Sequence, residues 1–193
     1  MYLANLSLRN FRQFGEGDSQ LDITFDKGLT ALVGGNDCGK SAIIDAIRYT
    51  LLTRDQNHIR VQPEDFYIDA KGKQADEISI RCELKDLNDD EKGAFAEYLT
   101  HDGADVSLIV NWVARRRSQC PSARRWVDVS VRSGMDGTGP VFESSVRELL
   151  SSAYLRPLRD AAREMSSGRG SRLSQILENV PEISKGATFD ENA

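Results

Sequence analysis

One short motif constrains this chain of 193 residues more than any other feature. Residues 34–41 read Gly-Gly-Asn-Asp-Cys-Gly-Lys-Ser and fit the pattern G-x-x-x-x-G-K-[ST]. The apolar run 29–33 precedes the motif and predicts a strand buried on both faces. Residues 41–52 follow it, and their apolar side chains recur at helical spacing. Because this pattern binds phosphate between a strand and a helix, the sequence predicts a nucleotide-binding α/β fold.

The motif positions have distinct physical roles. Glycines let backbone N–H groups turn towards phosphate oxygens, and the helix that follows directs its positive end at the same anion. Lys40 can reach the β- and γ-phosphates as the catalytic cation, and the Ser41 hydroxyl can bind Mg²⁺. We therefore expect ATP and Mg²⁺ as cofactors, the alternative being a glycine turn with an incidental lysine. The expected nucleotide-binding residues of the motif are Gly34, Asn36, Asp37, Cys38, Gly39, Lys40, Ser41 and Ala42.

Composition excludes several classes of protein. Hydrophobic residues make up 39% and charged residues 28% of the chain, as in ordinary globular domains. No run approaches the length of a transmembrane helix, and the N-terminus lacks the features of a secretory signal. Three widely spaced cysteines suit neither a disulfide framework nor a zinc site. We expect a cytoplasmic protein with no membrane contact.

The rest of the chain predicts strands first and helices last. Residues 88–99 begin with acidic residues and predict a helix, and the glycines and proline at 134–140 predict a break. We expect one lobe over residues 1–140 and a helical extension over 141–193. Alternating apolar residues predict strands over 2–8, 21–25, 78–84, 106–113 and 126–131, and helical spacing predicts helices over 141–150 and 160–180.

Arginines gather between the last two predicted strands. Guanidinium groups suit phosphate contacts, so this connection is a candidate DNA-binding segment with sequence-tolerant, salt-dependent affinity. A solvated loop with ordinary surface arginines is the alternative interpretation. The candidate DNA-binding residues are Arg115, Arg116, Arg117, Arg124 and Arg125.

Other nucleotide-binding classes fit less well. Residues 136–139 match the D-x-x-G of GTPases, but no apolar strand precedes them and no N-K-x-D motif occurs. A kinase would need an acceptor-binding lid, for which the sequence offers no sign. An ATPase is therefore the favoured class.

Residues 1–52 resemble the N-terminal lobe of ABC-type ATPase heads in the SMC, RecF and OLD (overcoming lysogenization defect) families. The resemblance rests on residues 6–14 with their Asn-Phe-Arg, on residues 25–34, and on Asn36 in the motif. It implies a P-loop NTPase fold with a mixed sheet and a helical C-terminal extension. It also implies that Arg12 contacts the nucleotide and that Gln62 stands where a glutamine senses the metal and the attacking water. An exposed arginine at a strand end is the alternative for Arg12.

Three further segments, 61–66, 154–161 and 168–173, are similar to OLD-family ATP-dependent nucleases. The resemblance implies an ATP-dependent DNA endonuclease in bacterial anti-phage defence. There, ATP binding and hydrolysis would control DNA cleavage by a Toprim domain outside this chain. The alternatives are a non-nuclease SMC/RecF-like ATPase that acts as a DNA-repair clamp or switch, and an interaction module in which the loop binds nucleotide only structurally.

The chain lacks one part that hydrolysis needs, a carboxylate pair after an apolar strand. The nearest candidate, residues 108–111, ends in Asn111, which cannot act as a base. We therefore expect the chain to stop before the Walker B strand and any nuclease domain, and to hydrolyse ATP poorly by itself. By resemblance, its partners are a second copy or a higher oligomer joined through the ATPase heads, DNA, and a partner defence protein.

Overall fold

A computed structural model describes residues 1–53, 59–103, 105–117 and 126–154. The chain divides into two units, residues 1–52 with 58–152 and residues 53–57 with 153–193. Nearly all described residues belong to the first unit, which is described here by itself. The predicted helix over 160–180 lies outside the described residues. No helix in the described part is long and apolar enough to cross a membrane.

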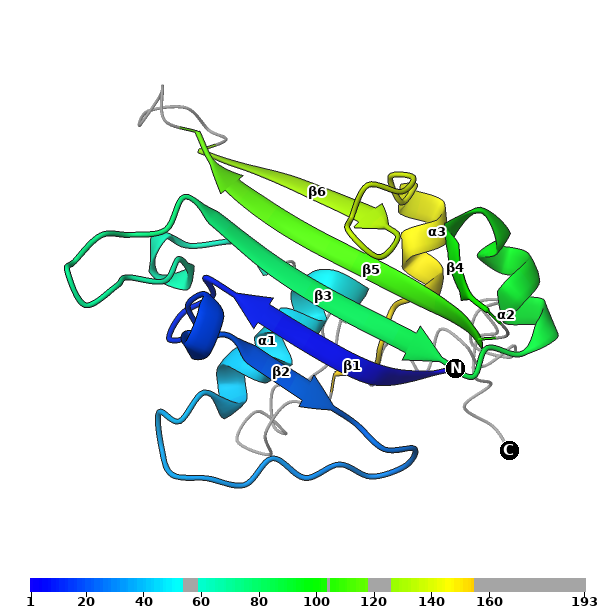
Figure 1. Cartoon of the computed structure of the whole chain (residues 1–193), viewed down its shortest axis with the longest axis horizontal. Helices are drawn as coiled ribbons and strands as arrows, with labels where there is room; N and C mark the ends of the chain where they lie inside the picture. Colours follow the sequence, from blue (N-terminus) through cyan, green and yellow to red (C-terminus); the bar gives the residue numbers. More distant parts are fainter. Residues whose placement is uncertain (54–58, 104, 118–125, 155–193) are drawn as a thin grey trace, which may run out of the picture. The chain divides into compact units, whose positions relative to one another are not determined.

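The described strands form one six-stranded sheet in which every strand pair is antiparallel (Figure 1). The strand order is β2-β1-β3-β5-β4, and β6 also pairs with β5. The long strand β5 makes this branching feasible, because β4 pairs with its first residues and β6 with its later ones. The strands are β1 (Tyr2–Arg9), β2 (Leu21–Thr24), β3 (Glu77–Lys85), β4 (Leu99–Asp102), β5 (Asp105–Arg116) and β6 (Val127–Ser133).

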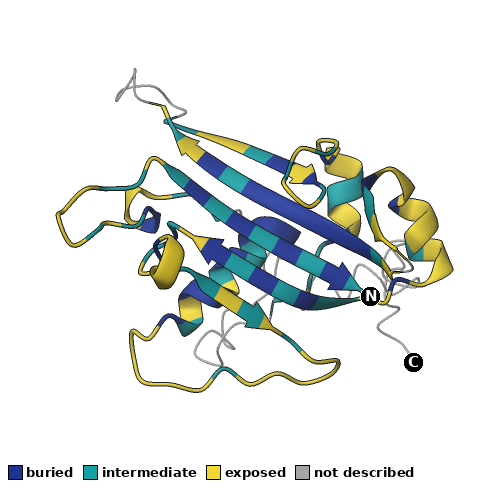
Figure 2. Cartoon of the chain, in the orientation of Figure 1, coloured by how far each residue is buried: buried dark blue, intermediate teal, exposed yellow. Residues whose placement is uncertain are grey.

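Helix α1 (Lys40–Leu51) covers one face of this sheet and packs against β3 and β5. Period-two alternation in β1 and β3 directs one set of side chains into this layer (Figure 2). Ala42 and Ala46 face the sheet and are buried, so that the helix backbone can approach the strands closely. The buried strand residues in this core are Leu6, Leu8, Ile78, Ile80, Cys82, Leu84, Leu108, Val110, Trp112, Ala114 and Val131.

Residues that follow β6 in the chain donate hydrogen bonds to the C-terminal end of α1. Arg147, in α3 (Ser144–Leu149), donates through Nη2 to the carbonyl of Tyr49 at 2.6 Å. The backbone N and Oγ of Ser152 donate to the carbonyl of Leu52 at 3.2 and 3.0 Å. Carbonyls at a helix end lack intrahelical partners, so these donors cap the helix that begins at the phosphate-binding motif.

Most predicted strands are confirmed within a few residues, whereas two helices are shorter than expected. The helix predicted over 88–99 is α2 (Asp89–Ala94) followed by a 3₁₀ turn (Ala96–Tyr98) and then the unpredicted strand β4. Asn88 and Glu91 form the capping box that starts α2, whereas Phe95 leaves the helix and is buried in the core. The helix predicted over 141–150 is limited to α3.

The predicted strand over residues 29–33 is wrong for this structure. These residues have no strand assignment, and Leu29 and Val33 are 99% and 93% exposed (Figure 2). A strand needs a hydrogen-bonded neighbour, and no strand in the described ranges pairs with this segment. The apolar run therefore lies on the surface of the described unit, directly before the motif.

Candidate nucleotide-binding site

Gly39 fixes the junction between the phosphate-binding motif and α1. It is the N-cap residue of α1 and has a φ of 97°, in the left-handed region that favours glycine. A Cβ at this position would lie 2.1 Å from Gln13 Nε2 and 2.7 Å from the Phe14 ring. Conformation and space therefore both require glycine here. Asp37 also has a positive φ, of 60°, so the loop turns sharply before the helix.

The Lys40 ammonium lies over its own loop. It donates to the carbonyl of Gly34 at 2.9 Å and to the carbonyl of Gly35, and it lies 3.4 Å from Cys38 Sγ. These contacts draw the loop around a positive charge at the N-terminal end of α1. Phosphate oxygens would compete with the two carbonyls for the same ammonium hydrogens.

The remaining motif residues divide between surface and core. Gly34, Asn36, Asp37, Cys38 and Ser41 are exposed, so their polar groups are accessible to a ligand. The Ala42 side chain is buried, which leaves only its backbone N–H to face a phosphate. A cation, free N–H groups at a helix N-terminus and a serine hydroxyl form a donor set that fits Mg²⁺-bound triphosphate.

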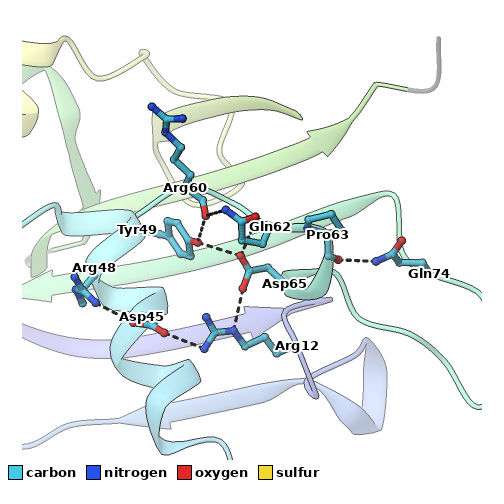
Figure 3. A network of polar contacts seen from close by, with 9 residues as sticks. All are labelled: Arg12, Asp45, Arg48, Tyr49, Arg60, Gln62, Pro63, Asp65 and Gln74. Carbon is cyan, nitrogen blue, oxygen red and sulfur yellow. Dashed lines mark hydrogen bonds and ion pairs between the residues drawn. The ribbon is translucent and has the colours of Figure 1, made fainter. Parts of the chain in front are cut away.

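Arg12 lies in a tight turn after β1 and is held by two carboxylates (Figure 3). Its Nε donates to Asp65 Oδ1 at 2.9 Å, and its Nη1 lies 2.9 Å from Asp45 Oδ2. Partial burial disfavours the charged form of Arg12, but the hydrogen bonds to Asp65 and Asp45 outweigh it, so its pKa lies above the ordinary value. Arg12 is therefore a cation held in place by two carboxylates, while its contact with nucleotide stays a prediction.

Asp65 is the buried centre of this cluster. It is 3% exposed, and its Oδ2 accepts from the Tyr49 hydroxyl at 3.0 Å and from the Gln62 backbone N at 2.8 Å (Figure 3). Burial, together with the nearby Asp65 carboxylate, raises the pKa of Tyr49 well above its ordinary value. Tyr49 thus remains a neutral hydrogen-bond donor at all ordinary pH values.

Gln62 begins the 3₁₀ turn Pro63–Asp65, and its side-chain Nε2 donates to the carbonyl of Arg60 at 3.2 Å. A second contact braces this turn, because Gln74 Nε2 donates to the carbonyl of Pro63 at 2.6 Å. The structure thus brings Gln62 and Arg12 into one cluster around Asp65. Sequence reasoning missed Asp45, Tyr49 and Asp65. The spacing of Gln62 and Asp65, three residues apart around Pro63, is a capping-box signal that could have pointed to Asp65.

The three described arginines of the candidate DNA-binding segment all have polar partners. Arg115 pairs with Glu77, and Arg117 Nη2 lies 3.4 Å from Asp128 Oδ1. Arg116 Nη1 donates to Gln74 Oε1 at 3.0 Å. These ion pairs reduce the local positive charge at the ends of β5 and β6. Arg124 and Arg125 lie outside the described residues.

A family model described as an AAA domain matches residues 5–139. This chain belongs to the AAA domain family. The match includes the Arg12 turn, the phosphate loop and Gln62, and an AAA domain with a P-loop implies ATP binding.

Curated relatives of this AAA domain are named chromosome partition protein Smc and DNA replication and repair protein RecF. Smc of Chlorobaculum tepidum is 49% identical over 51 residues, which cover 26% of this chain and 4% of that protein. Smc of Aquifex aeolicus is 27% identical over 121 residues, 60% of this chain and 10% of that protein. RecF of Roseiflexus castenholzii is 39% identical over 54 residues, 28% of this chain and 13% of that protein. The chain therefore spans only a small part of the length of these relatives.

Two solved structures support the same fold. A chain from work on ATP-driven dimerization and DNA-stimulated activation of SMC ATPases has a TM-score of 0.56 at 22% identity, covering 90% of this chain and 96% of that one. The Smc head bound to the C-winged-helix domain of ScpA has a TM-score of 0.51 at 22% identity, covering 78% and 39%. The fold class is confirmed: this AAA domain has a P-loop NTPase fold similar to that of SMC heads. None of these comparisons supports the more specific OLD-family assignment.

Proposed function

We propose that this AAA domain is the nucleotide-binding lobe of an SMC/RecF-like ATPase that acts in DNA maintenance. The observation that carries the proposal is the loop itself, in which Lys40 lies over residues 34–38 at the N-terminal end of α1. That arrangement suits a phosphate group of a nucleotide, because cation and helix N-terminus converge on one anion. The names of the Smc and RecF relatives favour DNA over other polymers.

In this proposal each candidate residue has a separate task at bound Mg·ATP. Lys40 neutralises the β- and γ-phosphates, and the N–H groups of Gly39 and Ala42 bind phosphate oxygens. Ser41 binds the Mg²⁺ ion through its hydroxyl, and Gln62 approaches the same ion from the 3₁₀ turn. Arg12 supplies a second cation, already fixed by Asp45 and Asp65.

We propose that ATP hydrolysis needs a second lobe and a second head. Leu29 and Val33 are exposed beside the loop, and the β5 residues Leu108–Asn111 carry no acidic group in a position to polarise water. A complementary lobe would supply both a strand partner for residues 29–33 and the missing carboxylates. Dimerisation through the heads, which the name of one solved SMC structure ascribes to ATP, is the corresponding proposal for oligomeric state.

The OLD-type nuclease in anti-phage defence is the finer alternative. It rests on residues 61–66, 154–161 and 168–173, and all of the last two segments except Tyr154 lie outside the described residues. The Smc and RecF relatives favour a function without a nuclease.

DNA contact by Arg115, Arg116 and Arg117 fits both an SMC/RecF-like ATPase and a nuclease. It would require these arginines to exchange their carboxylate or amide partners for phosphates.

Displacement of a fluorescent ATP analogue tests the proposed function. We expect the 193-residue chain to bind the analogue saturably with Mg²⁺, and unlabelled ATP to displace it. Lys40→Ala should weaken binding at least about tenfold, because a charge-assisted contact is lost. Asp86→Asn is a matched control, since Asp86 pairs with Lys27 on the surface and should not affect binding. Equal binding by wild type and Lys40→Ala would refute the proposal.

A further inference from the structure

Asp65 stands outside the phosphate-binding motif, yet it contacts both residues assigned to the nucleotide from outside that motif. Its Oδ1 accepts from Arg12 Nε at 2.9 Å, and its Oδ2 accepts from the Gln62 backbone N at 2.8 Å and from the Tyr49 hydroxyl at 3.0 Å. A carboxylate that is 3% exposed needs such donors to offset its desolvation. One buried group therefore joins three segments (Figure 3).

These contacts connect Arg12 and Gln62 to the helix that begins at Lys40. Tyr49 belongs to α1, and Asp45 on the same helix is the second carboxylate at Arg12. The link to Arg12 is doubled, because the Asp65 carbonyl also accepts from the Arg12 backbone N at 2.8 Å. Arg12 and Gln62 consequently have fixed positions relative to α1 and to each other.

Arg12 keeps part of its hydrogen-bonding capacity. A guanidinium has five N–H donors, of which Nε binds Asp65 and one Nη1 hydrogen faces Asp45. Among the described residues, Nη2 of Arg12 makes no hydrogen bond or ion pair. Its side chain is 30% exposed, so this outer edge is accessible to an anion. Two carboxylates on the inner edge thus orient the guanidinium and leave the Nη2 donors available for a ligand.

We propose that Asp65 is a positioning residue of the nucleotide site, which sets Arg12 and Gln62 relative to α1 so that both act on the same bound Mg·ATP. This inference rests on the proposed function and adds to it Asp65 as the group that couples Arg12 to Gln62. Asp65 itself touches neither nucleotide nor metal. A purely structural role would also make Asp65 important, so the test must separate the two roles.

The test measures binding of the fluorescent ATP analogue to the full 193-residue chain, with Mg²⁺ and with EDTA. Asp65→Asn keeps the size of the side chain and removes its charge. We expect binding to weaken about tenfold with Mg²⁺ and about threefold in EDTA, because Arg12 acts in both conditions whereas Gln62 needs the metal. Equal loss in the two conditions, or no loss in either, would overturn the inference.

A double-mutant cycle gives a readout that a structural role would not change. Asp65→Asn is combined with the pair Arg12→Ala and Gln62→Ala. If Asp65 acts through these two residues, adding Asp65→Asn to the pair should change the affinity less than about twofold. A structural role predicts the same factor of loss in every background, and that result would contradict positioning.

Two further variants keep the test decisive. Tyr49→Phe removes one donor to Asp65 and leaves all charges, so it should fold and weaken Mg·ATP binding in the same direction, by about twofold. If Asp65→Asn fails to fold, wild-type affinity in Tyr49→Phe overturns the inference. Equal binding of the analogue by wild type and Lys40→Ala would instead mean that the proposed function is wrong. Asp86→Asn is the control for replacing a carboxylate by an amide.

Discussion

At the residue scale, the phosphate loop depends on backbone conformation as much as on side-chain chemistry. Gly39 combines a φ of 97° with neighbours that leave no room for a Cβ, whereas a Cβ at Gly35 would meet nothing within 4 Å. The motif requires a glycine at position 39 but leaves position 35 open. Only the structure shows that the turn carrying Gln13 and Phe14 is what makes Gly39 indispensable.

Replacing Gly39 by alanine should therefore damage the loop. We expect Gly39→Ala to lower the free energy of unfolding by about 2 kcal/mol or more, since strain in φ adds to a steric clash. Binding of Mg·ATP should be lost with it. Gly35→Ala is the control and should keep the unfolding free energy within about 0.5 kcal/mol of wild type. Urea unfolding of both variants measures these free energies. Equal stability of the two would contradict a requirement for glycine at position 39.

The buried thiol of Cys82 gives a prediction about pH. Burial raises the pKa of Cys82 to about 12, against a partial lowering by Thr50, whereas an exposed thiol titrates near 9. Between these values the unfolded chain has lost the proton and the folded chain retains it. The folded state then binds more protons, so stability should fall as pH rises above about 9. Urea unfolding of wild type and Cys82→Ala at pH about 8 and about 10 measures this, and equal pH slopes would contradict it.

At the element scale, α1 depends on contacts at both of its ends. The phosphate loop precedes its first turn, and Arg147 and Ser152 donate to its last carbonyls. Sequence periodicity predicted α1, β1 and β3 well, because buried residues recur at every second position in the strands and at helical spacing in α1. It could not predict β4, a four-residue strand that exists through pairing with β5, nor the caps of α1, which come from about a hundred residues further along the chain.

The cap at the end of α1 can be tested directly. Arg147→Met keeps much of the side-chain length and removes the guanidinium that donates to the Tyr49 carbonyl at 2.6 Å. We expect the free energy of unfolding to fall by about 1–2 kcal/mol, because a half-buried carbonyl loses a charged donor at a helix C-terminus. Arg9→Met, at an exposed strand end, is the control. A loss no greater than that of the control, measured by thermal unfolding, would contradict the role of this cap.

At the scale of the whole molecule, the described unit has an AAA-domain fold, and we propose that it binds nucleotide without forming a complete hydrolytic site. Residues 29–33 were predicted as a buried strand, but all except the half-buried Leu32 are exposed, because no described strand pairs with this segment. The motif, the helix and the expected cofactor followed from sequence alone. The Asp65 cluster did not, because it joins residues that are far apart in sequence and have no shared pattern.

Nucleotide binding without a complete hydrolytic site predicts slow ATP turnover. The 193-residue chain should bind Mg·ATP yet release phosphate at a rate close to that of buffer, because the described residues include no carboxylate pair after a buried apolar strand to polarise the attacking water. Phosphate release is compared between wild type and Lys40→Ala. Turnover by wild type that Lys40→Ala abolishes would show that the chain carries a complete hydrolytic site.

The most direct measurement follows the backbone amide signals of the ¹⁵N-labelled chain by NMR while Mg·ATP is added. We predict saturable shifts of the amides of residues 34–42 and of Arg12 and Gln62, with the amides of β2 unchanged. Absence of saturable shifts in residues 34–42, or saturable shifts confined to other parts of the chain, would contradict the central claim that this loop binds the triphosphate.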